Sequence, residues 1–370
     1  MVIEYGKPET ERAILIGLAL DSRKRGDVAE SLEELAQLTL SAGAQVVGQR
    51  IQTKPHPNPA FFVGRGLVDE LKTQLGDLNG NCVIFDDPLS PAQQRNLEET
   101  LETKVIDRSI LILDIFATRA RTAAARLQVE LAQLEYTLPR LTGAWLHFSR
   151  QYGGIGAKGP GETQLETDRR SIRTKISHLK ERLKKLETQR QTQRSNRQDL
   201  FKVALVGYTN AGKSTLFNQL TKAEVRSADQ LFTTLDSTTR LMAIDHPKQI
   251  VLSDTVGFIK KLPHQLVESF KSTLEEVKQA DLLAHIIDAS DPHIEERIKQ
   301  TREVLKEIGA DSIPYLMIYN KIDLVPEFLP PLSNGHKSLM ISAQKKTGLA
   351  AVKAEIVVMA DQFQHARHTR

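Results

Sequence analysis

The stretch Gly207-Tyr-Thr-Asn-Ala-Gly-Lys213-Ser214 decides the fold of the second half of this chain. It follows the apolar run Phe201–Val206, which favours a strand, and the segment from Ser214 onward has the pattern of a helix. A glycine-rich turn ending in Lys-Ser between a strand and a helix brings backbone N–H groups and a helix N-terminus to one point, where they can surround phosphates. The sequence therefore predicts an α/β domain with a phosphate-binding loop, the P-loop.

The residue types in this loop have distinct expected roles. The backbone N–H groups from Asn210 through Thr215 can surround the α- and β-phosphates of a nucleotide. Lys213 can bridge the β- and γ-phosphates, and the Ser214 hydroxyl can bind Mg²⁺. The residues expected to contact the nucleotide here are Gly207, Tyr208, Thr209, Asn210, Ala211, Gly212, Lys213, Ser214 and Thr215.

A second motif, Asp254-Thr255-Val256-Gly257, follows the strand candidate Gln249–Ser253. The Asp254 carboxylate is expected to reach the metal through a water molecule, and the Gly257 amide to contact the γ-phosphate. The segment after Gly257 would then respond to the loss of that phosphate.

Between these two motifs lies Phe232-Thr233-Thr234-Leu235-Asp236, whose residues are all candidates for contact with the nucleotide. A threonine hydroxyl here could complete the ligands of the metal only while the γ-phosphate is present. Spacing alone does not choose between Thr233 and Thr234.

The base of the nucleotide is predicted by Asn320-Lys321-Ile322-Asp323, which follows the apolar strand candidate Tyr315–Tyr319. The Asp323 carboxylate can accept two hydrogen bonds from N1–H and the exocyclic amine of guanine, whereas adenine would leave it unpaired. Ser342-Ala343-Gln344 follows another strand candidate, Lys337–Ile341, and a backbone amide there could meet the guanine O6. The three motifs in this order predict a protein that binds guanine nucleotides.

Phe258, directly after Gly257, departs from the layout of Ras-like GTPases. A glutamine that orients the attacking water would be expected at this position, and phenylalanine cannot form that hydrogen bond. We therefore expect slow hydrolysis of GTP by the protein alone, accelerated by a partner that completes the site.

The N-terminal residues 1–108 alternate apolar strand candidates with amphipathic segments, a pattern that predicts a small α/β domain. The expected strands are Ala13–Leu20, Gln45–Ile51, Cys82–Phe85 and Val105–Ile106, and the expected helices are Val28–Leu40, Leu67–Leu75 and Ala92–Leu101.

Residues 109–198 are predicted to form a long antiparallel helical hairpin between the two α/β domains. Two apolar seams with alternating four- and three-residue spacing indicate helices that bury each other's stripes. The seams are Leu127, Leu131, Leu134 and Leu138 before Pro139, and then Ile172, Ile176, Leu179, Leu183 and Leu186. The GTPase domain, with a mostly parallel sheet covered by helices on both faces, is expected over 199–365, and 366–370 is expected to be a tail.

A glycine-rich loop, 150–162, separates the two hairpin helices. One interpretation is a flexible connection between helices. The other is that backbone without side chains lets the tip approach RNA closely, with basic residues around it. The candidates for RNA contact are Arg150, Gly153, Gly154, Lys158, Arg169, Arg170 and Arg173.

Charge is concentrated in the second hairpin helix. The chain of 370 residues has a formal net charge of only +4, yet Asp168–Arg197 holds 11 Lys and Arg against 3 Asp and Glu. Such a helix is either a solvated face or the electrostatic footprint of nucleic acid.

The remaining composition predicts a globular protein of the cytoplasm. The apolar stretch Ala13–Leu20 is shorter than the roughly 20 residues that span a bilayer, and acidic residues precede it, so neither a membrane span nor a signal peptide is expected. The single cysteine, Cys82, is expected to be a buried hydrophobic residue and fits a reducing compartment.

The chain resembles the HflX-type ribosome-associated GTPases of the translation-factor-related P-loop class. The resemblance rests on the stretches Gly153–Arg170, Phe232–Asp236, Asp254–His264 and Ala280–Pro292, and it covers nearly the whole chain. The first of these, Gly-Gly-Ile-Gly-Ala-Lys-Gly-Pro-Gly-Glu-Thr-Gln-Leu-Glu-Thr-Asp-Arg-Arg, is the most specific, since ordinary P-loop proteins lack it.

The resemblance implies that Thr234 is the metal-binding threonine and that Phe258 marks a class of GTPases with a hydrophobic residue at this position. Catalysis would then rest on Lys213, Thr234 and Gly257, and the Mg²⁺ ligands would be Ser214, Thr234 and, through water, Asp254. The resemblance also implies binding to the large ribosomal subunit, with the hairpin and its loop near the peptidyl transferase centre of the rRNA. It further implies hydrolysis stimulated by the ribosome and the splitting or rescue of stalled ribosomes under stress; we expect a monomer.

Two other functions fit the residues. One is a nucleotide-gated switch that binds a protein partner through the hairpin, with its basic face merely solvated. The other is a GTPase that assists ribosome assembly or RNA modification.

Overall fold

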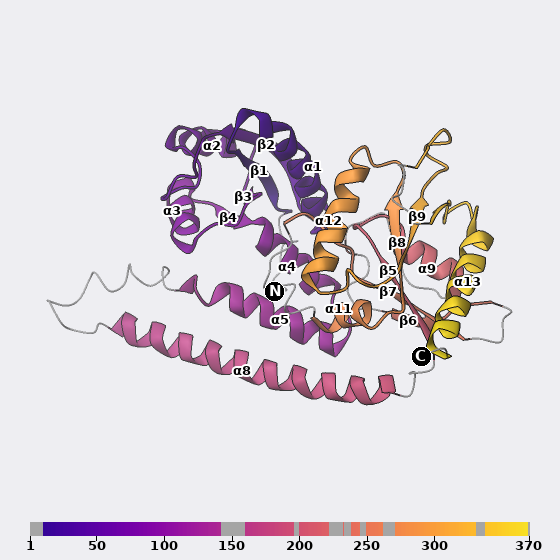
Figure 1. Ribbon diagram of the computed structural model, residues 1–370. Coiled ribbons are helices and arrows are strands. Elements are labelled where there is room, and N and C mark those ends of the chain that lie inside the picture. The colour runs from indigo at the N-terminus through magenta and orange to yellow at the C-terminus, as the bar shows by residue number, and fades with distance from the viewer. Residues whose placement is uncertain are drawn as a thin grey trace, which may run out of the picture. The chain divides into compact units, whose positions relative to one another are not determined.

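The computed structural model describes residues 10–141, 160–195, 200–221, 232, 238–244, 249–261, 271–330 and 337–368. Its contacts divide these residues into two compact units. The first contains the N-terminal sheet and most of the helical hairpin, and the second contains the P-loop. The elements are labelled in Figure 1, and each unit is described by itself.

The N-terminal domain has a four-stranded parallel sheet in the order β2-β1-β3-β4. Its strands are β1 (Arg12–Ala19), β2 (Gln45–Thr53), β3 (Cys82–Phe85) and β4 (Lys104–Asp107), and its helices are η1 (Ser22–Lys24), α1 (Arg25–Ser41), α2 (Arg65–Asp77) and α3 (Pro91–Leu101). Every strand and helix predicted for this region is present. Cys82 is fully buried as expected, and burial raises the pKa of its thiol to about 12.

Local sequence explains the start of α3, one residue before its predicted bound. The Ser90 hydroxyl accepts a hydrogen bond from Gln93 N, while the Gln93 side chain accepts one from Ser90 N. This reciprocal capping box, with Pro91 at the first helical position, satisfies donors that a helix start leaves unpaired. Leu97 and Leu101 on the inner face of the helix then enter the core.

A buried ion cluster fixes the start of helix α4 (Arg108–Arg119) against the N-terminal domain. Arg108 is 1% exposed. Its Nη1 lies 2.7 Å from Glu34 Oε2 on α1, and its Nη2 lies 2.6 Å from Asp86 Oδ1, directly after β3. Burial by itself lowers the pKa of Arg108, but the two carboxylates raise it above its ordinary value. The guanidinium also donates to the Ser31 carbonyl, so its donors are directed at several fixed acceptors.

The predicted hairpin consists of α5 (Ala123–Thr137) and α8 (Pro160–Ser195), which lie side by side and run in opposite directions (Figure 1). Leu127 and Leu131 of α5 and Leu179 of α8 are buried, as their seams predict. Ion pairs of 2.7 Å join Lys175 to Glu130 and Lys180 to Glu135 across the hairpin.

The N-terminal part of the predicted hairpin region is interrupted, because α4 ends at Arg119 and α5 begins at Ala123. The Thr122 hydroxyl accepts a hydrogen bond from Ala125 N and starts a new helix there. At the far end of α5, the Tyr136 hydroxyl donates to Asp107 at the carboxyl end of β4. Arg140 lies against the Tyr136 ring and 3.7 Å from Asp107, so this end of α5 is held to the N-terminal sheet.

The second unit contains a six-stranded sheet in the order β10-β9-β8-β5-β7-β6, with all pairings parallel except that of β6 with β7. The strands are β5 (Phe201–Val206), β6 (Thr238–Leu241), β7 (Ile250–Asp254), β8 (Leu282–Asp288), β9 (Tyr315–Asn320) and β10 (Ser338–Met340). The helices are α9 (Lys213–Thr221), α11 (Lys271–Lys278), α12 (Ile294–Glu307) and α13 (Leu349–His368).

Helices cover both faces of this sheet, as predicted (Figure 1). One face packs against α9 and α13, through Phe217 and Ile356 among others. The other packs against α11 and α12, through Val277 and Leu305. Helix α13 runs to His368, so the first three residues of the predicted tail, 366–370, are helical.

Strand order places the ligand-binding end of this domain. The chain leaves β5 and builds β6 and β7 on one side, and then returns to build β8, β9 and β10 on the other. Ligands of open parallel sheets bind at the carboxyl ends of the strands where the order reverses, which here is beyond Val206 of β5. The P-loop begins at that point.

Candidate functional site

The P-loop has the geometry that its sequence predicts, since it leaves β5 at Gly207 and enters α9 at Lys213. Gly212 has φ +91°, and a Cβ there would lie 2.2 Å from Asn320 Nδ2. A side chain at this position would therefore push apart the P-loop and the loop after β9. The Thr209 hydroxyl is buried and has no hydrogen-bond partner within the part of the chain that the structure describes, so it is available to a bound ligand.

Lys213 is held inside the loop in a preorganised position. Its Nζ donates to the carbonyl oxygens of Gly207 and Tyr208, at 3.0 and 2.7 Å, and the residue is only 6% exposed. Burial lowers the pKa of Lys213 to about 8, an effect that the Asp254 carboxylate partly opposes. A buried cation with so little compensating charge stabilises an anionic ligand, as a triphosphate is.

The two residues predicted to hold the metal are in contact. The Ser214 hydroxyl donates to Asp254 Oδ2 across 2.7 Å, and both residues are buried beside Lys213. A hydroxyl and a carboxylate oxygen are hard ligands of the kind that Mg²⁺ prefers. The Thr255 hydroxyl donates to the Leu205 carbonyl at 2.6 Å and fixes the end of β7 against β5. The side chains of Ser214 and Asp254 therefore fit a magnesium ion.

The chain after β7 lies directly against the P-loop. A Cβ on Gly257 would come within 2.8 Å of Thr209 Cα and 2.9 Å of Lys213 Nζ, so only glycine fits without displacement. Phe258 N donates to the Gly207 carbonyl at 3.1 Å, and Thr209 N donates to the Phe258 carbonyl at 2.8 Å. Gly257 therefore lies beside the lysine that is expected to contact the γ-phosphate.

The residues predicted to recognise the base are brought together by Asn320. Its Nδ2 donates to the Ala211 carbonyl, and its Oδ1 accepts from Ala343 N, both at 2.9 Å. Lys321 pairs with Asp288 at the end of β8, at 2.7 Å. The buried Asn320 thus joins the P-loop to the loop after β10, and the partly exposed Asp323 follows it in the same turn.

Of the predicted nucleotide contacts, the structure describes those of the P-loop, of the motif 254–257, of the motif 320–323 and of 342–344, together with Phe232, which is buried. Thr233, Thr234, Leu235 and Asp236 lie outside the described residues. Among the predicted RNA contacts, Arg150, Gly153, Gly154 and Lys158 lie outside them as well. Arg170 and Arg173 are exposed on α8, and Arg169 is partly exposed.

Three residues around the P-loop were not predicted from the sequence. They are Asp288, Lys260 and Arg297, which pair respectively with Lys321, Glu296 and Asp291. Asp288 could have been found, because a carboxylate at the end of the apolar run Leu282–Ile287 follows the same pattern as Asp254 after β7. The other two come from surface-like segments whose spacing gives no signal.

Comparison with known families and proteins identifies the chain. Residues 29–117 match the family described as "GTP-binding GTPase N-terminal", residues 119–197 match "GTP-binding GTPase Middle Region", and residues 202–321 match "50S ribosome-binding GTPase". The GTPase HflX of Caldanaerobacter subterraneus subsp. tengcongensis is 48% identical over 343 residues, which are 92% of this chain and 78% of that protein. The chain belongs to the HflX family of GTPases.

Other HflX relatives agree with this assignment. The GTPase HflX of Escherichia coli (strain K12) is 47% identical over 345 residues, 92% of this chain and 80% of that protein. Among solved structures, that of the SsGBP and GDP complex has a TM-score of 0.52 at 25% identity and covers 96% of this chain and 99% of its own. The protein is therefore a GTP-binding and GTP-hydrolysing enzyme, as the three sequence motifs predict.

Within the described ranges, no helix is both long enough and apolar enough to cross a bilayer.

Proposed function

We propose that this HflX family member hydrolyses GTP in a magnesium-dependent site while it is bound to the large ribosomal subunit, and that it splits or rescues stalled ribosomes under stress. The observation that carries the proposal is the match of residues 202–321 to the family described as 50S ribosome-binding GTPases. The basic helix α8 supports it independently, because Arg170 and Arg173 are exposed to a polyanionic partner.

The residues divide the reaction among them. Lys213, preorganised by two carbonyl oxygens, neutralises charge on the terminal phosphates, and the Gly257 amide donates to the γ-phosphate. Ser214, Asp254 and Thr234 would hold Mg²⁺, which would supply further charge neutralisation on the phosphate oxygens. Phe258 is 3% exposed and offers no group to orient water, so a group from the ribosome completes the site.

Cosedimentation with purified large ribosomal subunits tests the ribosome proposal. We expect enrichment with a nonhydrolysable GTP analogue over GDP, and a steep loss of binding as salt rises, because Lys and Arg side chains displace counterions. Equal sedimentation with both nucleotides contradicts the proposal.

A charge-reversal variant separates this function from a protein-binding switch. Changing Arg169, Arg170 and Arg173 to Glu should abolish cosedimentation and leave GTP affinity intact, since none of the three lies in the P-loop domain. The matched control reverses three other exposed cations, Arg25, Lys299 and Lys306, and should retain binding. Unchanged binding by the first variant would favour the protein-binding switch.

A role in ribosome assembly or RNA modification is the remaining alternative. It differs in the particle that is bound, because an assembly factor prefers immature subunits to mature ones. Cosedimentation with immature subunits but not with mature ones would favour that alternative.

A further inference from the structure

Tyr208, the second residue of the P-loop, contacts the segment after Gly257 through both its backbone and its side chain. Its backbone forms a parallel bridge with Phe258, flanked by the two hydrogen bonds that Phe258 makes with Gly207 and Thr209. Its side-chain hydroxyl then accepts a hydrogen bond from Lys260 N, at 2.7 Å. The same residue therefore fixes the segment at two points, two residues apart.

The Tyr208 side chain is itself held from the side of α12. The Arg297 guanidinium carbon lies 4.3 Å from the Tyr208 ring centroid, and Arg297 Nη1 donates to the Tyr208 hydroxyl at 3.1 Å. Arg297 is oriented in turn by Asp291, 3.2 Å from its Nε. The stacking of Arg297 on the ring and its charge-assisted hydrogen bond to the hydroxyl together fix the orientation of the Tyr208 side chain.

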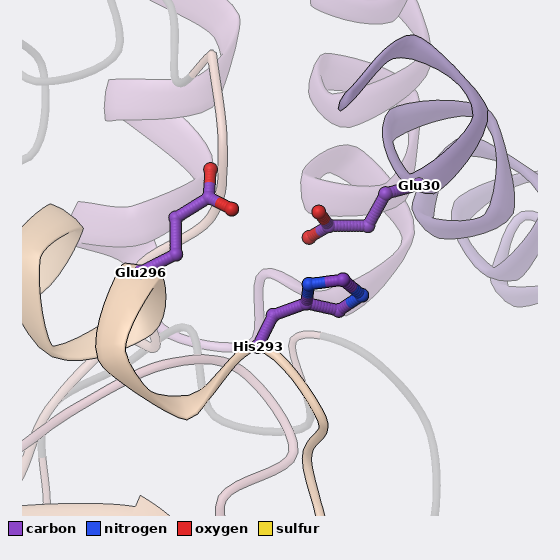
Figure 2. Close-up of side chains that lie close together, drawn as sticks. All are labelled: Glu30, His293 and Glu296. Atoms are coloured by element: carbon purple, nitrogen blue, oxygen red, sulfur yellow. The ribbon is translucent and has the colours of Figure 1, made fainter. Parts of the chain in front are cut away.

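A second connection from the same segment reaches α12. Lys260 Nζ lies 2.7 Å from Glu296, which projects from the first turn of α12, close after His293 (Figure 2). The hydrogen bond from Lys260 lowers the pKa of Glu296 below its ordinary value. Lys260 is thus held by its backbone to the P-loop and by its side chain to α12.

The segment held in this way, 257–260, contains Gly257, whose amide is expected to contact the γ-phosphate. Gly257 lies next to Lys213 Nζ, so the course of the chain after it determines where its amide can meet a terminal phosphate. The Tyr208 hydroxyl contacts this segment through Lys260 N, and it contacts α12 through Arg297 Nη1. Its loss should therefore affect a triphosphate more than a diphosphate.

We propose that Tyr208, oriented by Arg297, is a positioning residue of the GTPase reaction, which holds the segment 257–260 where Gly257 can bind the γ-phosphate. The inference rests on the GTPase activity and is independent of the ribosome as partner. Loss of ribosome binding would leave its readouts unchanged.

The test compares Tyr208→Phe with the wild type. For each protein, the affinities for fluorescently labelled GDP and for a fluorescently labelled nonhydrolysable GTP analogue are measured in Mg²⁺. The variant keeps the ring and its stacking on Arg297 but lacks the hydroxyl. Affinity for the GTP analogue should fall roughly 3- to 10-fold, the worth of one hydrogen bond, while affinity for GDP stays the same. The single-turnover rate of GTP hydrolysis should fall as well.

The chain offers a matched control in Tyr315→Phe, because Arg302 lies over the Tyr315 ring at 5.3 Å in the same domain. This variant should change neither affinity nor rate. An equal loss of affinity for both nucleotides in Tyr208→Phe, or a lower melting temperature with an unchanged affinity ratio, would show a merely structural role and overturn the proposal.

A double-mutant cycle tests the part assigned to Arg297. If Arg297 acts through the Tyr208 hydroxyl, Arg297→Met should shift the ratio of the two affinities in the same direction, and the double variant should lose less than the sum of the single losses. Strict additivity, or no effect of Arg297→Met on the ratio, contradicts the role of Arg297.

Discussion

The Ser214 hydroxyl donates a hydrogen bond to the Asp254 carboxylate across 2.7 Å. The two residues are 40 positions apart, one at the start of α9 and the other at the end of β7, yet the sheet brings them together beside Lys213. Both oxygens are therefore close together in the folded chain, where a hard cation could bind Ser214 directly and Asp254 through water. The pairing of β5 with β7 holds the two side chains that we propose as magnesium ligands next to each other.

The contact between Ser214 and Asp254 predicts that Asp254→Asn weakens the magnesium-dependent binding of GTP. The amide keeps the shape of the side chain but removes its charge, so the Mg²⁺ concentration that gives half-maximal GTP binding should rise roughly 10- to 100-fold. Ser253→Ala, one residue earlier on β7, is the matched control and should behave like the wild type. An unchanged Mg²⁺ requirement in Asp254→Asn would remove Asp254 from the metal site.

The buried cluster of Arg108, Glu34 and Asp86 predicts a large effect on stability. Arg108→Met leaves two carboxylates buried without their cation, which should lower the free energy of unfolding of the N-terminal domain by about 3–5 kcal/mol. Urea unfolding measures the effect. Arg95→Met removes only an exposed pair with Glu99 at 3.8 Å and should change stability by less than about 1 kcal/mol. Equal losses of stability in the two variants would contradict the large contribution that we assign to the buried cluster.

His285, on the central strand β8, predicts a loss of stability in acid. Burial, together with the charges of Arg302 and Lys213, lowers its pKa to about 3. In the unfolded chain His285 binds a proton near its ordinary pKa of about 6.5, whereas in the folded protein it stays neutral until about pH 3. The stability that neutral His285 contributes is therefore fully present above about pH 6.5. It falls as the pH drops below that value, by up to about 1.4 kcal/mol per pH unit.

Unfolding free energies measured between pH 7.5 and pH 5 test this prediction. His285→Leu should lose less stability than the wild type over that range, whereas His178→Leu, at an exposed position of α8, should follow the wild type. Parallel curves for the wild type and His285→Leu would show that His285 does not cause the acid sensitivity.

Phe258 predicts a slow enzyme in the absence of a partner. Its buried ring cannot orient an attacking water, so the protein alone should hydrolyse GTP on the order of 10⁻² s⁻¹ or slower. Phosphate release from purified protein measures the rate, and a Lys213→Ala preparation gives the background. A rate in the tens per second without any partner would contradict the prediction.

Much of the fold follows from periodicity, because apolar runs bounded by turn residues mark buried parallel strands. Within the described residues, all seven predicted elements of the N-terminal domain and the strands β5, β7, β9 and β10 are present, with bounds shifted by a few residues. Strand β6 was not predicted, since Thr238–Leu241 is a polar, partly exposed edge strand without a strong apolar pattern.

The site was predictable where one short motif supplies both the backbone conformation and the chemistry, as in the P-loop. It was not predictable where distant side chains meet. The contact of Tyr208 with Arg297 joins residues 89 positions apart, and neither position has a periodicity or spacing that signals the other. Only the packing of α12 beside β8 and the P-loop reveals that pair.

Isothermal titration calorimetry in Mg²⁺ tests the central claim most directly, with nonhydrolysable analogues of GTP and ATP and with the wild type and Asp323→Asn. The account predicts that the wild type binds the GTP analogue roughly 10⁴-fold more tightly than the ATP analogue, because adenine leaves the Asp323 carboxylate unpaired, and that Asp323→Asn loses this preference. Equal affinity of the wild type for the two analogues, or no heat of binding with the GTP analogue, would contradict it.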